Sequence, residues 1–401
     1  MGNFLKRHSH TQKYNIEEIK LHFYDVKTIK SILILSNLKN YRKLKKFTCI
    51  YCDLTELHDL PNSLQFLDCS NNKLTKLFNL PNSLIHLHCY NNNLTELPNL
   101  QNSLEILWCY NNNLTELPNL PNSLIHLHCY NNNLTELPNL PNSLIHLHCF
   151  NNNLTELPDL PNSLQILQCY NNNLTELPDL PNSLIELYCV NNNLTKLPDL
   201  PNSLILLYCF NNKLTELPNP NSLIRLDCSN NNLTKLPDLP NSLKYLNCSN
   251  NKLTELPNPN SLIYLDCSNN KLTELPNLPN SLNYLDCNNN NLVELPVDLP
   301  NSLIHLDCGN NNLTELPDLP NSLLDICCYN NNLHLIYSDL CIKTINKINL
   351  KNKIIKRMKL LNKTLLLEHS AMITMNPKRI ERLLDNHEID FFDGSFDNLT
   401  S

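Results

Sequence analysis

The stretch LPNSLIHLHCYNNNLTELPNL occupies residues 120–140, and residues 120–138 recur at 140–158 with one change, Phe150 in place of Tyr130. A globular core has no use for the same segment twice, because each part of such a core packs against different neighbours. Further copies with small edits fill most of the 401 residues. Repetition at this length is typical of an array in which each unit packs on the next one.

A cysteine marks the same place in every unit. It stands at Cys49, Cys69, Cys89, Cys109, Cys129, Cys149, Cys169, Cys189, Cys209, Cys228, Cys248, Cys267, Cys287, Cys308 and Cys328. The spacing is 20 residues, except for 19 at Cys209–Cys228 and Cys248–Cys267 and 21 at Cys287–Cys308. The short units read LPNPNS instead of LPNLPNS, and the long one contains an additional Val297. Because the length changes only after ELP, we expect this segment to be an outer turn.

The unit aligned on its cysteine reads S-L-x-x-L-x-C-x-N-N-x-L-T-E-L-P-x-L-P-N. In one copy the pattern falls on Leu124, Leu127, Cys129, Asn132 and Leu134. It resembles the leucine-rich repeat, L-x-x-L-x-L-x-x-N-x-L, in fifteen tandem copies over about residues 44–333. The LTELPNLP continuation is similar to the short 20-residue class of secreted bacterial effectors. The Asn-, Ile- and Lys-rich flanks look like those of leucine-rich repeat proteins of giant viruses.

The predicted fold is a leucine-rich-repeat solenoid with a parallel β-sheet on its concave face. One 20-residue unit cannot bury its own leucines, whereas stacked units bury them against each other. Leu124, Leu127 and Cys129 alternate with polar residues, as a strand with one buried face requires. The return limb LTELPNLP holds two prolines in eight residues, so we expect it to run extended or as polyproline II.

Two repeated polar positions have predicted structural roles. The asparagine three places after the cysteine, such as Asn132, is expected to turn inward and satisfy backbone groups where the strand ends. The first unit has Cys52 at this place. With three glycines in the chain, asparagine also has to supply any left-handed turn conformations. The repeat-phase cysteines are expected to be buried free thiols, because parallel neighbours stand too far apart for a disulfide.

Charge divides the chain into three predicted domains. Residues 1–52 carry 11 Lys/Arg against 3 Asp/Glu, residues 53–333 carry 9 against 27, and residues 334–401 carry 11 against 8. Residues 1–43 are interpreted as a basic, mainly helical cap, with NIEEIKLHFYDVKTIKSILIL forming one or two helices. Residues 44–333 are the repeats. Residues 334–401 are interpreted as a basic helical cap or tail, whose Lys343–Lys363 segment could also fold back as an autoinhibitory cap.

Motifs of enzymatic chemistry are missing from the sequence. Three glycines cannot build a phosphate-binding loop, and no HExxH or nucleophile elbow occurs. The effectors that the repeats resemble often carry a C-terminal ubiquitin-ligase domain, but the 68 residues after Leu333 are too few for it. No apolar run reaches the ~18 residues of a membrane span. We therefore expect a cytoplasmic protein that is not an enzyme and has no cofactor, no small-molecule substrate and no transmembrane segment.

The outward columns of the concave sheet are the candidate partner-binding surface. In the first half they are aromatic or histidine, and in the second half small, acidic or tyrosine. The candidate residues are His88, Trp108, Tyr110, His126, His128, Tyr130, His146, His148, Phe150, Tyr170, Tyr188, Tyr208, Asp227, Tyr264, Asp266, Tyr284, Asp286 and Asp307. Folding alone is expected to give no reason for like charges on neighbouring strands. We expect residues 225–309 to bind a basic segment and residues 86–210 an apolar or aromatic one.

Two simpler interpretations stay open for these columns. The two halves could descend from two founder units that were duplicated, without any selected function. His126, His128, His146 and His148 should form a flat rectangle of about 5 by 7 Å. This suits the tetrahedral geometry of zinc poorly, so no metal ligands are assigned. The alternative is surface histidines that become charged together below about pH 6.5.

The leading functional hypothesis is a non-enzymatic scaffold that binds a protein through its concave sheet, with a host protein as the candidate partner. We expect the protein to be a monomer. One alternative is a substrate-recognition adaptor for ubiquitin ligation. Another is a weak binder of nucleic acid or of a membrane surface through the basic flanks. Nucleic acid is the less favoured partner, because the net charge of −18 over residues 53–333 repels phosphate.

Overall fold

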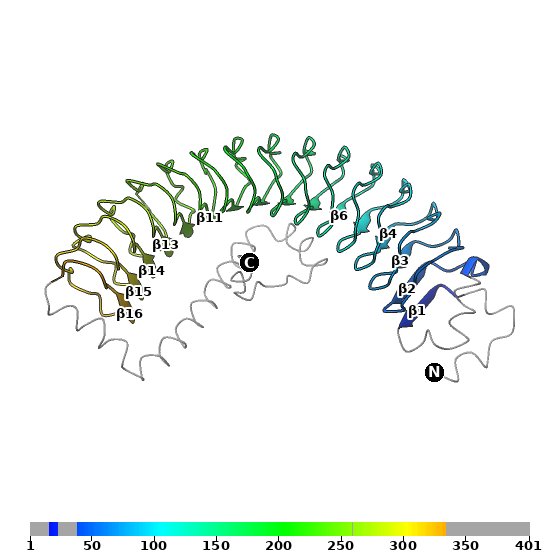
Figure 1. Ribbon diagram of the computed structural model, residues 1–401, viewed down its shortest axis with the longest axis horizontal. Helices are drawn as coiled ribbons and strands as arrows, with labels where there is room; N and C mark the ends of the chain where they lie inside the picture. Colours follow the sequence, from blue (N-terminus) through cyan, green and yellow to red (C-terminus); the bar gives the residue numbers. More distant parts are fainter. Residues whose placement is uncertain (1–15, 23–37, 259, 334–401) are drawn as a thin grey trace. The chain divides into compact units, whose positions relative to one another are not determined.

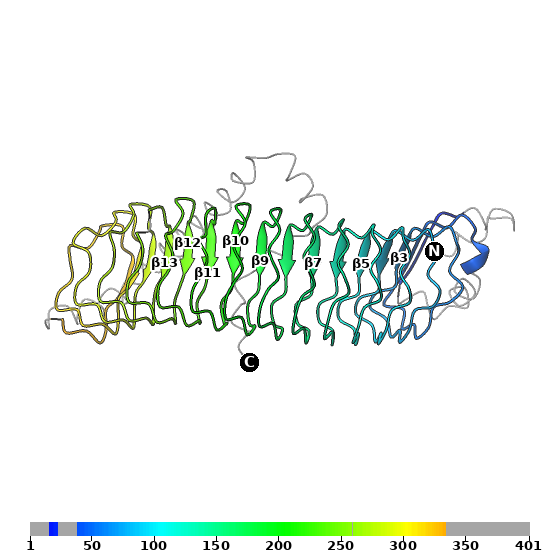
Figure 2. The same cartoon turned by 90° about the horizontal axis from the view of Figure 1, so that it is seen from above.

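The computed structural model describes residues 16–22, 38–258 and 260–333, which all fall in one compact unit. They form a parallel sheet of sixteen strands, in which each strand pairs with the strands before and after it in the sequence. Figure 1 shows the strands along the inner side of a curved array, and Figure 2 shows them side by side. A sheet in sequence order without crossovers is that of a solenoid, as the repeat pattern predicts.

The strands are short and evenly spaced along the chain. They are β1 Glu18–His22, β2 Lys46–Ile50, β3 Phe66–Asp68, β4 His86–His88, β5 Ile106–Trp108, β6 His126–His128, β7 His146–His148, β8 Ile166–Gln168, β9 Glu186–Tyr188, β10 Leu206–Tyr208, β11 Arg225–Asp227, β12 Tyr245–Asn247, β13 Tyr264–Asp266, β14 Tyr284–Asp286, β15 His305–Asp307 and β16 Asp325–Cys327. Each repeat therefore contributes one strand.

The core consists of columns of identical side chains. In the coil of β6, Leu124, Leu127, Cys129 and Leu134 are all fully buried. The residues between them point to the other face, because successive side chains of a strand alternate. Each buried leucine or cysteine packs against its equivalents in the two adjacent coils, about 4.8 Å away. This is the nearest-neighbour packing that makes one repeat unstable alone and an array stable.

The inward asparagine has the predicted role. The Asn132 Nδ2 group donates hydrogen bonds to the carbonyl oxygens of Cys109 (3.1 Å), Cys129 (3.1 Å) and Tyr130 (3.3 Å). Its Oδ1 atom accepts one from the backbone N–H of Leu114 (3.0 Å). In the first coil, the Cys52 thiol replaces this amide and donates to the carbonyl oxygens of Leu21 and Ile50.

A second asparagine, two places after the cysteine, turns the chain. Its φ is positive throughout, for example 52° at Asn131 and 51° at Asn191, which confirms the predicted left-handed role of asparagine. From Asn71 to Asn211 these side chains form a ladder, in which each Nδ2 group donates to the Oδ1 atom of the preceding coil. After Asn211 the ladder changes, and Asn250 and Asn269 instead donate to the neighbouring serine of their own coil.

The return limb contains no helix or strand in the described coils, so the prediction of a non-helical convex side is confirmed. Coils are joined there by serine: the Ser123 hydroxyl donates to the Leu104 carbonyl oxygen (2.6 Å), and the Ser143 hydroxyl donates to that of Leu124 (2.6 Å). Each proline of this limb lacks a backbone N–H and therefore leaves no donor at its own position that would need a partner.

The N-terminal flank differs from the prediction. Glu18–His22, which falls in the segment expected to form a helix, is strand β1 and pairs in parallel with β2. The short 3₁₀ helix η2 covers Leu38–Asn40. The segment is a strand because Ile19 and Leu21 alternate with polar residues, and pairing satisfies the open edge of β2. The remaining predicted cap helices, including those in 334–401, lie outside the described residues.

The cysteine prediction is confirmed at fourteen positions and wrong at one. The repeat-phase cysteines from Cys49 to Cys308 are buried free thiols, and burial raises their pKa, for example to about 12 at Cys149. Cys328, in the last coil, is disulfide-bonded. Cys49 and its successors stay reduced because adjacent strands hold them farther apart than the ~3.8 Å Cβ separation of a disulfide.

Candidate interaction surface on the concave sheet

Each coil presents three outward positions, and the parallel register lines them up from coil to coil. The register pairs His126 with His146 and His128 with His148. The first column contains the first residue of each strand, the second column the residue before the cysteine, and the third column the residue after it. Equivalent side chains of adjacent coils therefore come into contact, as predicted from the repeat.

The rings in the first half form two continuous stacks. In the third column, Tyr90, Tyr110, Tyr130, Phe150 and Tyr170 follow each other at centroid distances of 4.2–4.4 Å and interplanar angles of 8–11°. In the second column, Trp108 stacks on His88 at 4.0 Å and on His128 at 5.4 Å. The faces of these rings therefore contact the rings of adjacent coils. As a result, an incoming molecule contacts the ring edges.

The four histidines of β6 and β7 form the predicted rectangle. The centroid distances are 4.6 Å for His126–His146, 4.1 Å for His128–His148 and 6.4 Å for His146–His148. The Nδ1 atoms of His126 and His146 are 3.1 Å apart, which is a hydrogen bond between a protonated and an unprotonated nitrogen. His128 and His146 are buried rather than exposed. Among the described residues no group of three or more possible ligands could hold a metal ion.

The acidic column has a structural role that the sequence analysis did not find. The Asp227 Oδ1 atom accepts hydrogen bonds from the Ser229 backbone N–H (3.1 Å) and from the Ser229 hydroxyl (2.7 Å). Asn247 accepts the same two bonds from Ser249 (3.1 and 2.8 Å). Folding thus gives a reason for a capping side chain at the end of each of these strands, but it gives none for the like charges, as expected. Asn247 shows that the cap needs no charge.

The charges of this column are poorly compensated. Burial raises the pKa of Asp227 and of Asp286 to about 6. Burial also raises the pKa of Asp266 and of Asp307. In the described part of the chain no lysine or arginine forms an ion pair with any of the four. The second half therefore holds buried and half-buried carboxylates whose charged form costs free energy.

A third ring stack runs beside the acidic column. Tyr245, Tyr264, Tyr284 and His305 follow each other in the first column at 4.3–4.4 Å, with interplanar angles of 7–11°. The Arg225 guanidinium lies over the Tyr245 ring at 5.7 Å and closes one end of the stack.

The structure places all of the candidate residues in these three columns. His86, Tyr90, Tyr245 and His305 occupy the same columns and also take part in the contacts. The repeat phase was sufficient to find these four. The capping bonds of the aspartates could have been found from the pattern Asp-Cys-Ser, which recurs at Asp227, Asp266 and Asp68.

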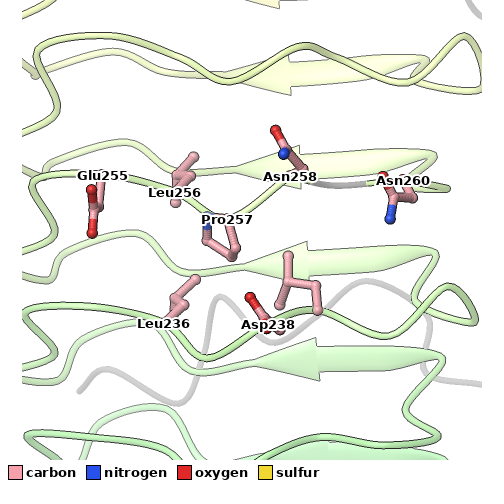
Figure 3. A pocket seen from close by; sticks show the side chains of 8 residues that line it. Leu236, Asp238, Glu255, Leu256, Pro257, Asn258 and Asn260 are labelled. Atoms are coloured by element: carbon pink, nitrogen blue, oxygen red, sulfur yellow. The ribbon is translucent and has the colours of Figure 1, made fainter.

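A hollow on the convex limb lies away from these columns. It is lined by Leu236, Asp238, Leu239, Glu255, Leu256, Pro257, Asn258 and Asn260 (Figure 3). It adjoins the short repeat Cys248–Cys267, in which the LPNPNS segment lacks one leucine. Its lining includes no candidate residue.

Comparison with known proteins agrees with the repeat pattern. The Leucine Rich Repeat family pattern matches residues 242–260 and 261–282. YopM from Yersinia enterocolitica is 39% identical over 74% of this chain and 71% of that chain, with a TM-score of 0.66. YopM from Yersinia pestis, described as a leucine-rich effector protein, is 44% identical over 72% and 84%, with a TM-score of 0.64. The chain belongs to the leucine-rich repeat family.

Other comparisons concern the core of this leucine-rich repeat protein. The functional domain of InlJ from Listeria monocytogenes, which includes a cysteine ladder, is 26% identical over 76% of this chain and 70% of that chain, with a TM-score of 0.54. The buried column from Cys49 to Cys308 is a comparable feature here. None of the curated proteins matches the sequence. The similar solved structures named above are bacterial and give no support to a viral origin.

Membership of the leucine-rich repeat family indicates the general type of function. Leucine-rich repeat scaffolds, including the effector-like ones, typically serve in protein–protein interaction and are typically not enzymes. No helix among the described residues has the length and apolar character to cross a bilayer.

Proposed function

We propose that the protein is a non-enzymatic scaffold that binds a protein partner through the concave sheet. The supporting observation is the set of ring stacks, which extends over the coils of β4 to β8 and again over β12 to β15. Stacked rings are already ordered in the free protein, so binding loses little side-chain entropy. Aromatic side chains on an open sheet face are typical of interface hot spots.

The two halves of the sheet are proposed to take different parts of the partner. Residues 225–309 would bind a basic segment, because Asp227, Asp266, Asp286 and Asp307 have no lysine or arginine partner in the described coils. Residues 86–210 would bind an apolar or aromatic segment. The Lys and Arg side chains of a basic segment would supply the positive charge that these carboxylates lack. The negative electrostatic field would also attract such a segment from a distance.

We further propose that this interaction takes place in the cytoplasm, between a monomeric scaffold and a host protein. The fourteen free thiols of the repeat core favour a reducing compartment. Adaptor, nucleic-acid and membrane roles would depend on the basic flanks, most of which lie outside the described residues.

Site-specific photo-cross-linking tests the proposed surface. A photoreactive phenylalanine is placed at Tyr110 or Tyr264 on the concave sheet, or at the exposed Glu116 on the convex limb as the control. In extract from the relevant cell, we expect discrete protein adducts from the two concave positions and none from Glu116. Adducts that form equally at Glu116, or that form only there, would contradict the concave surface.

A further inference from the structure

The four histidines of β6 and β7 pack on one another in two pairs. His126 and the buried His146 form the first pair, with their Nδ1 atoms 3.1 Å apart. His128 and His148 form the second pair, with ring centroids 4.1 Å apart and an interplanar angle of 6°. The centroids of His146 and His148 are 6.4 Å apart, so the two pairs make one histidine cluster. Each imidazole of this cluster therefore has another imidazole as a close neighbour.

The hydrogen bond of the first pair limits the number of protons that the pair can hold. One Nδ1 atom carries a hydrogen and donates it to the other Nδ1 atom, which is unprotonated. A first additional proton can bind the Nε2 atom of the donor ring, and the hydrogen bond then becomes charge-assisted. A second additional proton must bind the accepting Nδ1 atom, which breaks the hydrogen bond between His126 and His146. The packed pair thus accepts one additional proton.

Ring stacking sets a similar limit for the second pair. If His128 and His148 were both protonated, two positive charges would lie face to face with ring centroids 4.1 Å apart. His128 is buried, and the repulsion between two charges is strong where water is excluded. Trp108 stacks on His128 at 5.4 Å, so a neighbouring coil packs against this ring as well. Protonation of both histidines therefore favours separation of the two stacked rings.

The groups that face the histidine cluster supply little compensating charge. The outward positions of the adjacent strands β5 and β8 are Ile106, Trp108, Ile166 and Gln168. The ionisable groups on this side of the four coils and beneath the cluster are Glu105, Tyr110, Tyr130, Tyr170, Cys129 and Cys149. Tyrosine and cysteine side chains are neutral between pH 5 and 8, and the charge of Glu105 also acts on His86 of β4. One carboxylate compensates at most one of four imidazolium charges.

We propose that the histidine cluster is a pH-sensitive switch in the first half of the concave sheet. Near pH 7.5 the cluster is uncharged, hydrogen-bonded and packed. Below about pH 6.5, where an unperturbed imidazole becomes protonated, the packed cluster holds two additional protons, one in each pair. Binding of further protons separates the rings of β6 from those of β7 and leaves this surface positively charged. Histidine clusters are a known means of changing an interface at pH 5–6.

The switch makes stability depend on pH in one direction. In the unfolded chain the four imidazoles each bind a proton below about pH 6.5, whereas the packed cluster binds two. Because the unfolded state then binds more protons, the folded state loses stability as the pH falls. Each proton that the packed cluster excludes lowers the folding equilibrium constant about tenfold per pH unit. This behaviour belongs to the free protein, so the inference goes beyond the scaffold function and does not depend on it.

Urea denaturation of the full chain at pH 7.5, 6.0 and 5.0 tests the proposal, because urea does not screen charges. His146→Gln retains an amide that can bond to the His126 Nδ1 atom, and it removes the second charge of the first pair. Between pH 6.0 and 5.0 we expect its folding equilibrium constant to fall about tenfold less than that of the wild type. His126→Gln, which replaces the other partner, should have the same effect.

His88→Gln is the matched control. His88 also lies on the concave sheet, but its Nδ1 atom is 3.9 Å from the Asp68 carboxylate, which compensates its positive charge. We expect this variant not to flatten the pH dependence of folding.

Two outcomes would overturn the proposal. One is the same pH dependence for the wild type, His146→Gln and His126→Gln. The other is equal flattening by His88→Gln, which would indicate a general effect of removing a histidine. Neither measurement involves a partner, so the photo-cross-linking experiment tests the scaffold function separately.

Discussion

At the residue scale, asparagine provides most of the polar connections of the array. One asparagine per coil turns the chain with positive φ, and the next one binds the backbone groups of two coils. The Asn192 side chain bonds the carbonyl oxygens of Cys169, Cys189 and Val190, and it accepts from the Leu174 N–H. Because these groups are buried, no water can replace the amide.

We predict that Asn192→Ala lowers the free energy of unfolding by on the order of 1–3 kcal/mol, because it leaves buried backbone groups without partners. Guanidinium denaturation measures the change. The neighbouring Asn193→Ala, at a partly exposed side chain, is the control and should change stability by less than about 0.5 kcal/mol. Equal effects of the two substitutions would show that the inward amide has no special role.

A second prediction at this scale concerns pH. Burial raises the pKa of Asp227 to about 6, above the ~3.9 of an unfolded aspartate. The folded state therefore binds the proton more tightly, so this group favours folding at low pH and loses that contribution as pH rises through about 6. Asp227→Asn keeps the acceptor for Ser229 and removes the charge, as Asn247 does naturally. We expect it to stabilise the protein at pH 7.5.

Thermal denaturation at pH 7.5 and pH 4.5 measures this effect. The stability difference between Asp227→Asn and the wild type should shrink at the lower pH, because the wild-type carboxyl group is then protonated. Asp227→Ala serves as the contrast, because it removes the charge and also the acceptor of the two hydrogen bonds from Ser229. We expect this variant not to be stabilised at pH 7.5 as Asp227→Asn is. A stability difference that is independent of pH would contradict the raised pKa.

At the element scale, the coils are coupled differently in the two halves. The asparagine ladder links successive coils from Asn71 to Asn211. In the second half Asn250 and Asn269 bond within their own coils, and neighbouring carboxylates repel each other. In a repeat array, stability is approximately a sum over units and the interfaces between them. The two halves should therefore differ in stability.

We predict that the second half unfolds at lower denaturant concentration than the first at pH 7.5. Trp108 fluorescence reports on the first half, whereas far-ultraviolet circular dichroism reports on all strands, so the second signal should begin to change earlier. Asp227→Asn, Asp266→Asn, Asp286→Asn and Asp307→Asn together should bring the two curves closer by removing the repulsion. Coincident curves for the wild type would instead indicate one cooperative unit.

At the scale of the whole molecule, the repeat region carries a large negative charge. Residues 53–333 have a net charge of −18, and four of the carboxylates line the second half of the concave sheet. Such a field attracts a cationic segment before contact and accelerates its association. The effect weakens with salt, because the Debye length falls to about 8 Å at 0.15 M ionic strength.

We predict that the same fourfold Asp→Asn variant binds a decalysine peptide with a lower association rate and a smaller dependence of that rate on salt. Stopped-flow measurements between low and physiological salt give both quantities. Replacing Glu116, Glu136, Glu156 and Glu176 of the convex limb by Gln removes the same charge elsewhere and is the control. An equal loss in both variants would assign the attraction to net charge rather than to the acidic column.

The sequence by itself determined the coil, its period and the sheet. The recurrence of Leu127 and Cys129 in one phase predicts their burial, because repeated units bury their apolar side chains on each other. The same phase placed the outward-facing columns of the concave sheet. The roles of Asn131 and Asn132 could also be predicted, since they follow from the local turn and from backbone groups that need a partner.

Only the tertiary structure decided which groups are bonded and which remain unsatisfied. The strand at Glu18–His22 depends on the edge of β2, a partner remote in sequence, so local helical spacing misled the prediction. The capping bonds of Asp227, the closed ring faces beside Tyr110 and the unsatisfied Trp108 N–H depend on side-chain orientation. Repeat spacing brings these columns together, but contacts between coils and the direction of each side chain determine their chemistry.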